Sequence, residues 1–250
     1  MKFSEVTFAY TTRRAPVFDA LTWNVPSGRT VLLGPNGAGK STLLGIAATA
    51  VRPARGYCEI DGICFGRGGS NARRAAAVVG WMPQTIEAVR GLRTLEQTAY
   101  AGWLRGLSRR DAQRAAIEAL ELVDLTKLAD KPSHQLSGGQ LRRLGLASAL
   151  VHQPRQLLLD EPTAGLDPVQ RERFREILNR VPGGCDAIVS THQVDDLTDV
   201  YDNVAVMLGG RIWFADSVEA FMALATPGAA RPADDAYRVV TRGIPAEAAS

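Results

Sequence analysis

The residues best suited to chemistry in this 250-residue chain form a glycine-rich loop near the N-terminus. Glycines let such a loop turn so that successive backbone N–H groups point at phosphate oxygens, and a helix starting there adds its positive dipole end. In the pattern G-x-x-x-x-G-K-[ST] the lysine reaches the β- and γ-phosphates and the hydroxyl binds Mg²⁺. The loop therefore predicts a nucleoside triphosphate site built by Gly34, Pro35, Asn36, Gly37, Ala38, Gly39, Lys40, Ser41 and Thr42.

An acidic pair, Asp160 and Glu161, follows a second apolar run over residues 157–159. A buried strand that ends in Asp160 places one carboxylate near the Mg²⁺ ion of a phosphate loop. Glu161 lies one residue further, beyond the strand end, where it could hold the attacking water. Acidic pairs are common at strand ends, so this pair predicts an NTPase site only together with the loop.

A second helix start that could bind phosphate lies at Leu136–Gln140. Ser137 can cap the helix predicted over residues 141–151, while Gly138 and Gly139 leave their backbone N–H groups bare. Two phosphate-binding helix ends in one chain are unusual unless each faces a different nucleotide.

The elements around these motifs predict a mixed α/β fold. Apolar and polar residues alternate through the first 35 positions, as strands do, and the apolar run at 30–33 enters the loop and a helix over 40–50. A helical pattern over 169–180 separates two later apolar runs, which gives the βαβ order of a parallel sheet. The later buried strands are predicted at residues 156–160, 187–190 and 204–208.

The chain is predicted to form one domain over residues 1–225 and a tail. Residues 91–152 carry only helical patterns, and these roughly 60 residues exceed what a βαβ crossover needs, so we expect an inserted helical subdomain. From residue 226 the chain is rich in Pro, Gly and Ala and has little to bury. The tail over 226–250 is therefore expected to be loosely held.

The composition and charge exclude several classes of protein. Hydrophobic residues make up 46% and charged residues 22%, which excludes a mainly disordered or fibrous chain. The net charge of +3 is too small to favour direct nucleic-acid binding. The longest stretch without a charged residue, 75–86, is shorter than the about 20 apolar residues of a membrane-spanning helix, and no signal peptide is evident. Cys58, Cys64 and Cys185 are expected to be reduced thiols.

Taken together, these motifs resemble those of the nucleotide-binding subunit of an ABC transporter, over Lys2–Leu224. In that family's order, Tyr10 matches the aromatic residue that stacks on adenine and Gln84 matches the Q-loop. Asp167 matches the D-loop, and His192 matches the switch histidine. The resemblance implies a RecA-like P-loop NTPase core with a parallel sheet, an N-terminal antiparallel β subdomain and an inserted helical subdomain.

The resemblance also implies the mechanism. ATP is the nucleotide, Mg²⁺ is held by Ser41, Gln84 and Asp160, and the catalytic residues are Lys40, Gln84, Glu161 and His192. Two copies, or this chain and a related ATPase subunit, face head to tail. The signature residues Ser137, Gly138, Gly139 and Gln140 of one chain, with Asp167, then close on the nucleotide of the other.

A separate transmembrane permease subunit is the implied partner, which places this chain peripherally on the cytoplasmic face of the cell membrane. The region 85–105 follows Gln84 and opens the helical insert, so its exposed apolar residues, Ile86, Leu92 and Leu95, are expected to dock this partner. The run 190–197, with Gly209–Arg211 beyond it, looks most like separately encoded exporter subunits, which favours export over import.

Two details depart from the family's pattern, and two other functions compete. Leu141 follows the signature where a basic residue is frequent, and Gln156 opens the strand before Asp160, but neither is expected to touch the chemistry. A non-transport ABC ATPase acting on ribosomes or DNA is the alternative, although such proteins usually carry two cassettes or a long coiled coil. A P-loop kinase or GTPase would not explain Leu136–Gln140.

Overall fold

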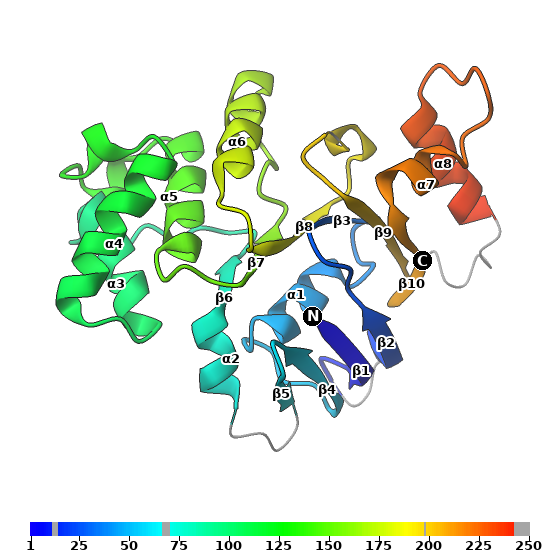
Figure 1. Cartoon of the computed structure of the whole chain (residues 1–250), viewed down its shortest axis with the longest axis horizontal. Coiled ribbons are helices and arrows are strands. Elements are labelled where there is room, and N and C mark those ends of the chain that lie inside the picture. Colours follow the sequence, from blue (N-terminus) through cyan, green and yellow to red (C-terminus); the bar gives the residue numbers. More distant parts are fainter. Residues whose placement is uncertain (12–14, 67–70, 198, 243–250) are drawn as a thin grey trace. The chain divides into compact units, whose positions relative to one another are not determined.

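The computed structural model describes residues 1–11, 15–66, 71–197 and 199–242 (Figure 1). The chain forms two compact units. The first unit contains Met1–Ala75 and Asp186–Ser250, and the second contains Ala76–Cys185. The boundary at residue 75 falls inside helix α2 (Ala72–Val78).

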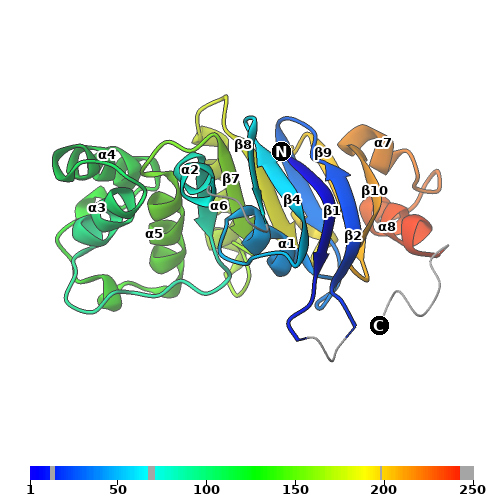
Figure 2. The same ribbon diagram turned by 90° about the horizontal axis from the view of Figure 1, so that it is seen from below.

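The N-terminal part of the first unit is a four-stranded sheet in the order β2-β1-β4-β5, and every pair in it is antiparallel. Figure 2 shows β2, β1 and β4 of this sheet side by side. Phe3, Val6 and Phe8 are its buried residues on β1, whereas strict alternation from Phe3 would bury Glu5 and Thr7. The strand is irregular between Phe3 and Val6, where Glu5 has a φ of 49°, and this turns Val6 and Phe8 to the buried side. The ring of Phe3 stacks on Trp23 at 6.0 Å. The predicted antiparallel β subdomain is thus confirmed. Its strands are β1 (Lys2–Phe8), β2 (Phe18–Asn24), β4 (Arg55–Ile60) and β5 (Ile63–Gly66).

The second sheet of this unit contains the strand that enters the glycine-rich loop. This strand, β3, pairs in parallel with β8 on one side and β9 on the other, and β10 pairs antiparallel with β9. Residues 30–33 of β3 are all buried, as expected of a parallel strand covered on both faces. The bounds are β3 (Arg29–Leu33), β8 (Asp186–Thr191), β9 (Asn203–Leu208), β10 (Arg211–Ser217) and, after the loop, α1 (Lys40–Ala47).

Helices α7 (Val218–Met222) and α8 (Pro232–Arg242) lie beside β9 and β10 at the C-terminal end (Figure 1). Ala236 of α8 is fully buried in a core cluster with Phe221 and the apolar residues of β3 and β9. The tail expected to be loosely held from residue 226 therefore contains a packed helix, because the apolar residues of α8 gather on one face. Residues 243–250 lie outside the described part.

The second unit joins a pair of parallel strands to a group of helices. Strands β6 and β7 pair in parallel, and α5 packs against β6 and against α3 and α4. This unit is wider than the predicted insert at 91–152, because it also holds both strands and α6. Its elements are β6 (Val79–Met82), α3 (Thr94–Leu104), α4 (Arg109–Leu122), η1 (Thr126–Leu128), η2 (Ser133–Gln135), α5 (Gly138–Leu150), β7 (Gln156–Asp160) and α6 (Pro168–Arg180).

Throughout the described ranges, every helix is too short or too polar to traverse a lipid bilayer.

Candidate functional site

The glycine-rich loop connects the end of β3 to the start of α1, as the sequence predicts. Gly37 and Gly39 have φ angles of 85° and 105°, in the left-handed region that glycine adopts without a steric penalty. A Cβ on Gly39 would also lie 2.8 Å from the ring of Phe18. The backbone conformation and the packing therefore both require glycine at position 39.

Lys40 is the first residue of α1, and its side chain turns back into the loop. The residue is only 5% exposed, and its Nζ donates to the carbonyl oxygens of Gly34 at 2.6 Å and Pro35 at 3.0 Å. The ammonium group is thereby held beside the backbone N–H groups at the helix start. This arrangement concentrates positive charge and donors at one point, which suits a phosphate.

The turn after β9 braces this loop. The Gly210 N–H donates to the Ala38 carbonyl at 3.0 Å, and a Cβ on Gly34 would lie 2.2 Å from the Met207 carbonyl oxygen. Sequence reasoning did not foresee this brace. The paired glycines at 209 and 210 are its only sequence signal, because a close approach of two backbones excludes larger residues.

Tyr10 and His192 lie in the same unit as the loop. The Tyr10 hydroxyl is 2.8 Å from the Thr42 Oγ1, and its ring meets Phe8 edge to face at 5.0 Å, although two thirds of the residue is exposed. His192 directly follows β8 and is exposed. The turn after it is closed by a 2.6 Å hydrogen bond from Thr191 Oγ1 to Asp196 Oδ2.

The acidic pair lies in the second unit, at the carboxyl end of β7. All five residues of β7 are buried, and Asp160 and Glu161 are 3% and 8% exposed. Glu161 has a φ of 46°, a left-handed conformation that is uncommon for a residue other than glycine. Such conformations cost about 1–3 kcal/mol and persist where surrounding structure imposes them, often at functional sites.

Gln84 lies just beyond β6 and contacts the same carboxylate. Its Nε2 donates to Glu161 Oε2 at 3.2 Å, so these two predicted site residues are brought together. Arg142 of α5 joins them: its guanidinium donates to the carbonyl oxygens of Gln84 and Ala164. Sequence reasoning assigned Arg142 no part in the site, because a contact with backbone carbonyls leaves no motif.

The signature residues form the start of α5. Ser137 is the N-cap: its Oγ accepts from the Gln140 N–H at 3.3 Å, and Gln140 Oε1 accepts from the Ser137 N–H at 3.0 Å. A Cβ on Gly138 would meet nothing within 4 Å, whereas one on Gly139 would lie 2.7 Å from Gln170 Oε1. The helix start is therefore capped from within and open to approach at Gly138.

Asp167 caps the neighbouring helix. Its Oδ1 accepts from the Gln170 N–H at 2.9 Å at the start of α6, and Pro168 occupies the first helical position. The predicted D-loop residue thus has a structural role as an N-cap, and its side chain is exposed.

The donors predicted for Mg²⁺ fit a hard cation. Ser41, Gln84 and Asp160 offer a hydroxyl, an amide and a carboxylate oxygen, which are ligands that Mg²⁺ accepts. Within the described residues there is no group of three or more His, Cys, Asp or Glu side chains that could hold a metal by itself. Mg²⁺ is usually held by one or two protein oxygens together with phosphates and water.

The predicted site thus divides between the two units. The glycine-rich loop, Tyr10 and His192 belong to the first unit. The second unit holds the acidic pair with Gln84, and also the signature residues and Asp167. Each half is ordered by its own hydrogen bonds.

The apolar residues expected to dock a partner are less exposed than predicted. Ile86, Leu92 and Leu95 are half-buried, and Ile86 packs so closely on α5 that a Cβ on Gly145 would lie 2.7 Å from its Cδ1. The exposed large apolar residues of the region 85–105 are instead Val89 and, on α3, Tyr100, Trp103 and Leu104. The rings of Tyr100 and Trp103 stack at 5.8 Å.

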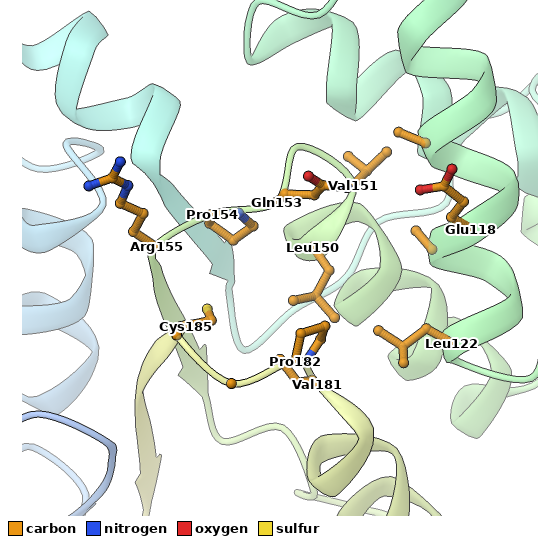
Figure 3. Close-up of a pocket in the computed structure, with 14 residues that line it drawn as sticks. Glu118, Leu122, Leu150, Val151, Gln153, Pro154, Arg155, Val181, Pro182 and Cys185 are labelled. Carbon is orange, nitrogen blue, oxygen red and sulfur yellow. The ribbon is translucent and has the colours of Figure 1, made fainter.

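A pocket of about 530 Å³ lies elsewhere in the second unit, between the ends of α4, α5 and α6 (Figure 3). Leu122, Leu150 and Pro182 give it mainly apolar walls, and Arg155 at its edge directly precedes β7. The acidic pair follows the opposite end of that strand, about 15 Å away. This pocket is therefore separate from the candidate site.

Comparison with known proteins places the chain in a family. A family model described as ABC transporter matches residues 18–164. The cobalt import ATP-binding protein CbiO of Rhodobacter capsulatus is 36% identical over 197 residues, which cover 78% of this chain and 70% of that protein. The daunorubicin/doxorubicin resistance ATP-binding protein DrrA of Streptomyces peucetius is 35% identical over 196 residues, covering 78% and 58%.

Several curated relatives are longer, and the aligned part of this chain spans 57% to 59% of their length. Among solved structures, the dimeric structure of MJ0796, a bacterial ABC transporter cassette, matches with a TM-score of 0.75 at 23% identity, over 87% of this chain and 98% of that one. This likeness confirms the predicted fold, with its parallel sheet, antiparallel β subdomain and helical subdomain. The chain therefore belongs to the ABC transporter family, as one of its ATP-binding cassettes, a class of ABC-type ATPases.

Proposed function

We propose that the chain binds ATP with Mg²⁺ and hydrolyses it to drive a membrane transporter. The observation that carries this proposal is Lys40, whose ammonium group is held inside a loop shaped by left-handed glycines. Carbonyl oxygens are weaker partners for an ammonium group than a phosphate is, so Lys40 can exchange them for the β- and γ-phosphates. Membership in the ABC transporter family supports ATP as the nucleotide.

In this mechanism each half of the site has its task. Ser41, Gln84 and Asp160 would hold Mg²⁺, which would neutralise phosphate charge. Lys40 neutralises the phosphates from the loop side, because phosphoryl transfer needs positioning and charge compensation more than covalent chemistry. Glu161 orients the attacking water and accepts its proton, for which it must exchange its contact with Gln84.

Residues at the edge of the loop bind the rest of the nucleotide. The adenine stacks on Tyr10, whose hydroxyl contact with Thr42 fixes the ring beside the start of α1. His192 contacts the γ-phosphate and responds to its loss, and the bonded turn of Thr191 and Asp196 supports this histidine.

The second phosphate-binding helix end serves a second chain. Two copies, or this chain and a related ATPase subunit, pair head to tail, so that Ser137 and Gly139 of one contact the γ-phosphate held by the other. The open space at Gly138 supports this arrangement, because a nucleotide can approach the N–H groups there. Gln140 and Asp167 lie beside this contact.

Closure and reopening of the pair then move a separate transmembrane permease subunit, with this chain bound peripherally at the cytoplasmic face of the membrane. We propose export as the direction, which the run 190–197 and the likeness to DrrA support. Import is the competing direction, and the likeness to CbiO is of similar strength.

Glu161→Gln tests the shared-site mechanism. The change keeps the size of the side chain but removes the carboxylate, so ATP should bind normally while hydrolysis falls by about 10²–10⁴-fold, the usual contribution of a positioned base. Trapped ATP should hold the pair closed, and gel filtration with ATP and Mg²⁺ should show a monomer-to-dimer shift.

Adding Ser137→Arg to Glu161→Gln provides the control for this experiment. A bulky cation at the second helix end should abolish the dimer without affecting ATP binding to the loop. A Glu161→Gln protein that stays monomeric with any related subunit and hydrolyses ATP at the native rate would refute the mechanism.

Transport direction can be measured in membrane vesicles that hold the chain and its permease. For an exporter, ATP supplied at the cytoplasmic face should drive drugs such as daunorubicin into inverted vesicles. Uptake only into right-side-out vesicles, with ATP inside, would establish import instead.

A further inference from the structure

Four residues of the second unit form a closed ring of hydrogen bonds around Glu161. The guanidinium of Arg142 donates to the Gln84 carbonyl, and the Gln84 side chain donates to the Glu161 carboxylate at 3.2 Å. The Glu161 carbonyl accepts from the Ala164 N–H at 3.1 Å, and the Ala164 carbonyl accepts from Arg142 at 3.3 Å. The ring thus joins both sides of Glu161 to one guanidinium.

An arginine suits this place, because its planar fork donates to the two carbonyls from two separate nitrogens, Nη1 and Nη2. A lysine would have to reach both carbonyls from a single nitrogen. Burial of the guanidinium lowers the pKa of Arg142, and the nearby carboxylates of Glu161 and Asp160 act in the opposite direction. The positive charge is therefore close enough to the acidic pair to interact with it.

The position of Arg142 in the chain adds a second connection. It lies in the second turn of α5, the helix whose first residues are the signature residues. The two carbonyls it binds belong to the segment after β6 and to the turn after β7, which carry Gln84 and Glu161. One side chain therefore ties the signature helix to the two segments that place the candidate base.

We propose that Arg142 is a positioning residue for ATP hydrolysis: through Gln84 and the turn at 161–164 it holds Glu161 in its left-handed, buried conformation. This inference rests on the proposed function, in which Glu161 orients the attacking water. Arg142 touches neither the nucleotide nor the water itself. Because a misplacement of about 1 Å can cost a factor of about 10² in rate, the loss of this tie should lower kcat.

Arg142→Met tests the proposal in the full chain, with its permease where hydrolysis requires it. The variant keeps the apolar stem and removes both donors. We expect kcat for ATP to fall about 10- to 100-fold while KM for ATP changes less than about threefold. Arg142→Lys should recover part of the loss through its charge. Arg110→Met, which removes an exposed arginine from the first turn of α4, should match the native rate.

A double-mutant cycle separates positioning from a general loss of structure. If Arg142 acts through Glu161, then adding Arg142→Met to Glu161→Gln should lower the residual rate by less than about twofold. A native rate in Arg142→Met, or a full additional loss in the Glu161→Gln background, would overturn the proposal. If Arg142→Met fails to fold, the same cycle with Arg142→Lys decides.

Different results would refute the proposed function and the role of Arg142. If the native chain with its permease hydrolyses no ATP, the proposed function is wrong. If Glu161→Gln behaves as expected while Arg142→Met is indistinguishable from Arg110→Met, only the role of Arg142 is wrong.

Discussion

The two helix starts that are proposed to bind phosphate are built differently. The start of α1 is held by the rest of its unit: Lys40 binds the loop's own carbonyls, Gly210 binds Ala38, and Phe18 packs against Gly39. The start of α5 is held by its own capping box, and Gly138 faces open space. The first helix start is thus preformed by contacts within its unit, whereas the second leaves its N–H groups open to approach at Gly138.

Because of this difference, glycine is needed for different reasons at positions 39 and 138. At Gly39 the fold itself requires glycine, through a left-handed φ and a close ring. At Gly138 the fold would accept a side chain, so the requirement comes from what must approach the helix start. A substitution at Gly39 should therefore lower the free energy of unfolding. A substitution at Gly138 should instead impair ATP-driven dimerisation with little effect on stability.

The largest effect is expected at Lys40. Lys40→Ala removes the only charge that the loop directs at the phosphates, and ATP hydrolysis should fall at least about 10³-fold, the scale of losing a strong electrostatic contact. Lys127→Ala, which removes an exposed lysine from η1, serves as the control and should leave the rate unchanged. Hydrolysis at the native rate by purified Lys40→Ala, with its permease, would show that the loop is not the ATP site.

Acid should destabilise the second unit before the first, because of His152 next to α5. Its Nε2 lies 3.1 Å from the Val79 carbonyl, and burial, with Arg105 nearby, lowers its pKa to about 4. Between pH 6.5 and pH 4 His152 is protonated in the unfolded chain but stays neutral in the folded chain. The free energy of unfolding therefore falls as the pH drops below 6.5, and the loss reaches about 3 kcal/mol at pH 4.

Hydrogen exchange can locate this loss. Protection in β6 and α5, corrected for the intrinsic rate, should drop by about 100-fold between pH 6.5 and pH 4. In His152→Gln, which keeps a donor for Val79 but does not titrate, the drop should be much smaller. An equal drop in the variant, or the same drop in β3 and β9, would contradict the prediction.

The matched pair Gly39→Ala and Gly138→Ala tests the glycine comparison directly. Gly39→Ala should lower the free energy of unfolding by about 2 kcal/mol, through the left-handed φ and the contact with Phe18. Gly138→Ala should change it by less than about 0.5 kcal/mol, yet reduce ATP-driven dimerisation in the Glu161→Gln background. Equal destabilisation by the two changes would remove the distinction between a preformed and an open site.

The sequence predicts best those parts whose pattern is local. Strand β7 occupies the predicted residues 156–160, because three successive leucines at 157–159, preceded by Pro154, favour a short buried strand. Helix α8 was missed, since the Pro, Gly and Ala residues around it are typical of a loose tail. Its apolar residues nevertheless recur at helical spacing and gather on one face, which packs on the core cluster.

In the candidate site, too, contacts between distant parts of the chain could not be predicted. The glycine-rich loop, the acidic pair and the helix start at Ser137 were predicted from residue type and spacing. Tyr10, Gln84, Asp167 and His192 were predicted from the family resemblance, and the ring around Glu161 was not predicted. It depends on backbone carbonyls, which every residue has, and on α5 lying beside two segments far away in the sequence. The division of the site between two compact units is likewise a property of long-range contacts.

The smallest expected effects concern Ser137 and Ser108, which cap the starts of α5 and α4. Ser137 Oγ accepts from the Gln140 N–H at 3.3 Å and Ser108 Oγ accepts from the Asp111 N–H at 3.1 Å, so each satisfies one N–H at a helix start. Ser137→Ala and Ser108→Ala should each lower stability by about 1 kcal/mol or less. Their effects on function should differ, because only the Ser137 hydroxyl is proposed to contact the second chain's nucleotide.

Two kinds of measurement separate the capping role of Ser137 from its proposed contact with the nucleotide. Urea unfolding reports the cap, whereas ATP hydrolysis and dimerisation in the Glu161→Gln background report the contact. Ser137→Ala should lower the hydrolysis rate by about 10-fold, the cost of one hydrogen bond to a charged phosphate, while Ser108→Ala should not. A Ser137→Ala protein with native hydrolysis and dimerisation would mean that the hydroxyl only caps α5. Contact with the second nucleotide would then fall to the backbone N–H groups of Gly138 and Gly139, at a helix start that the structure leaves open at Gly138.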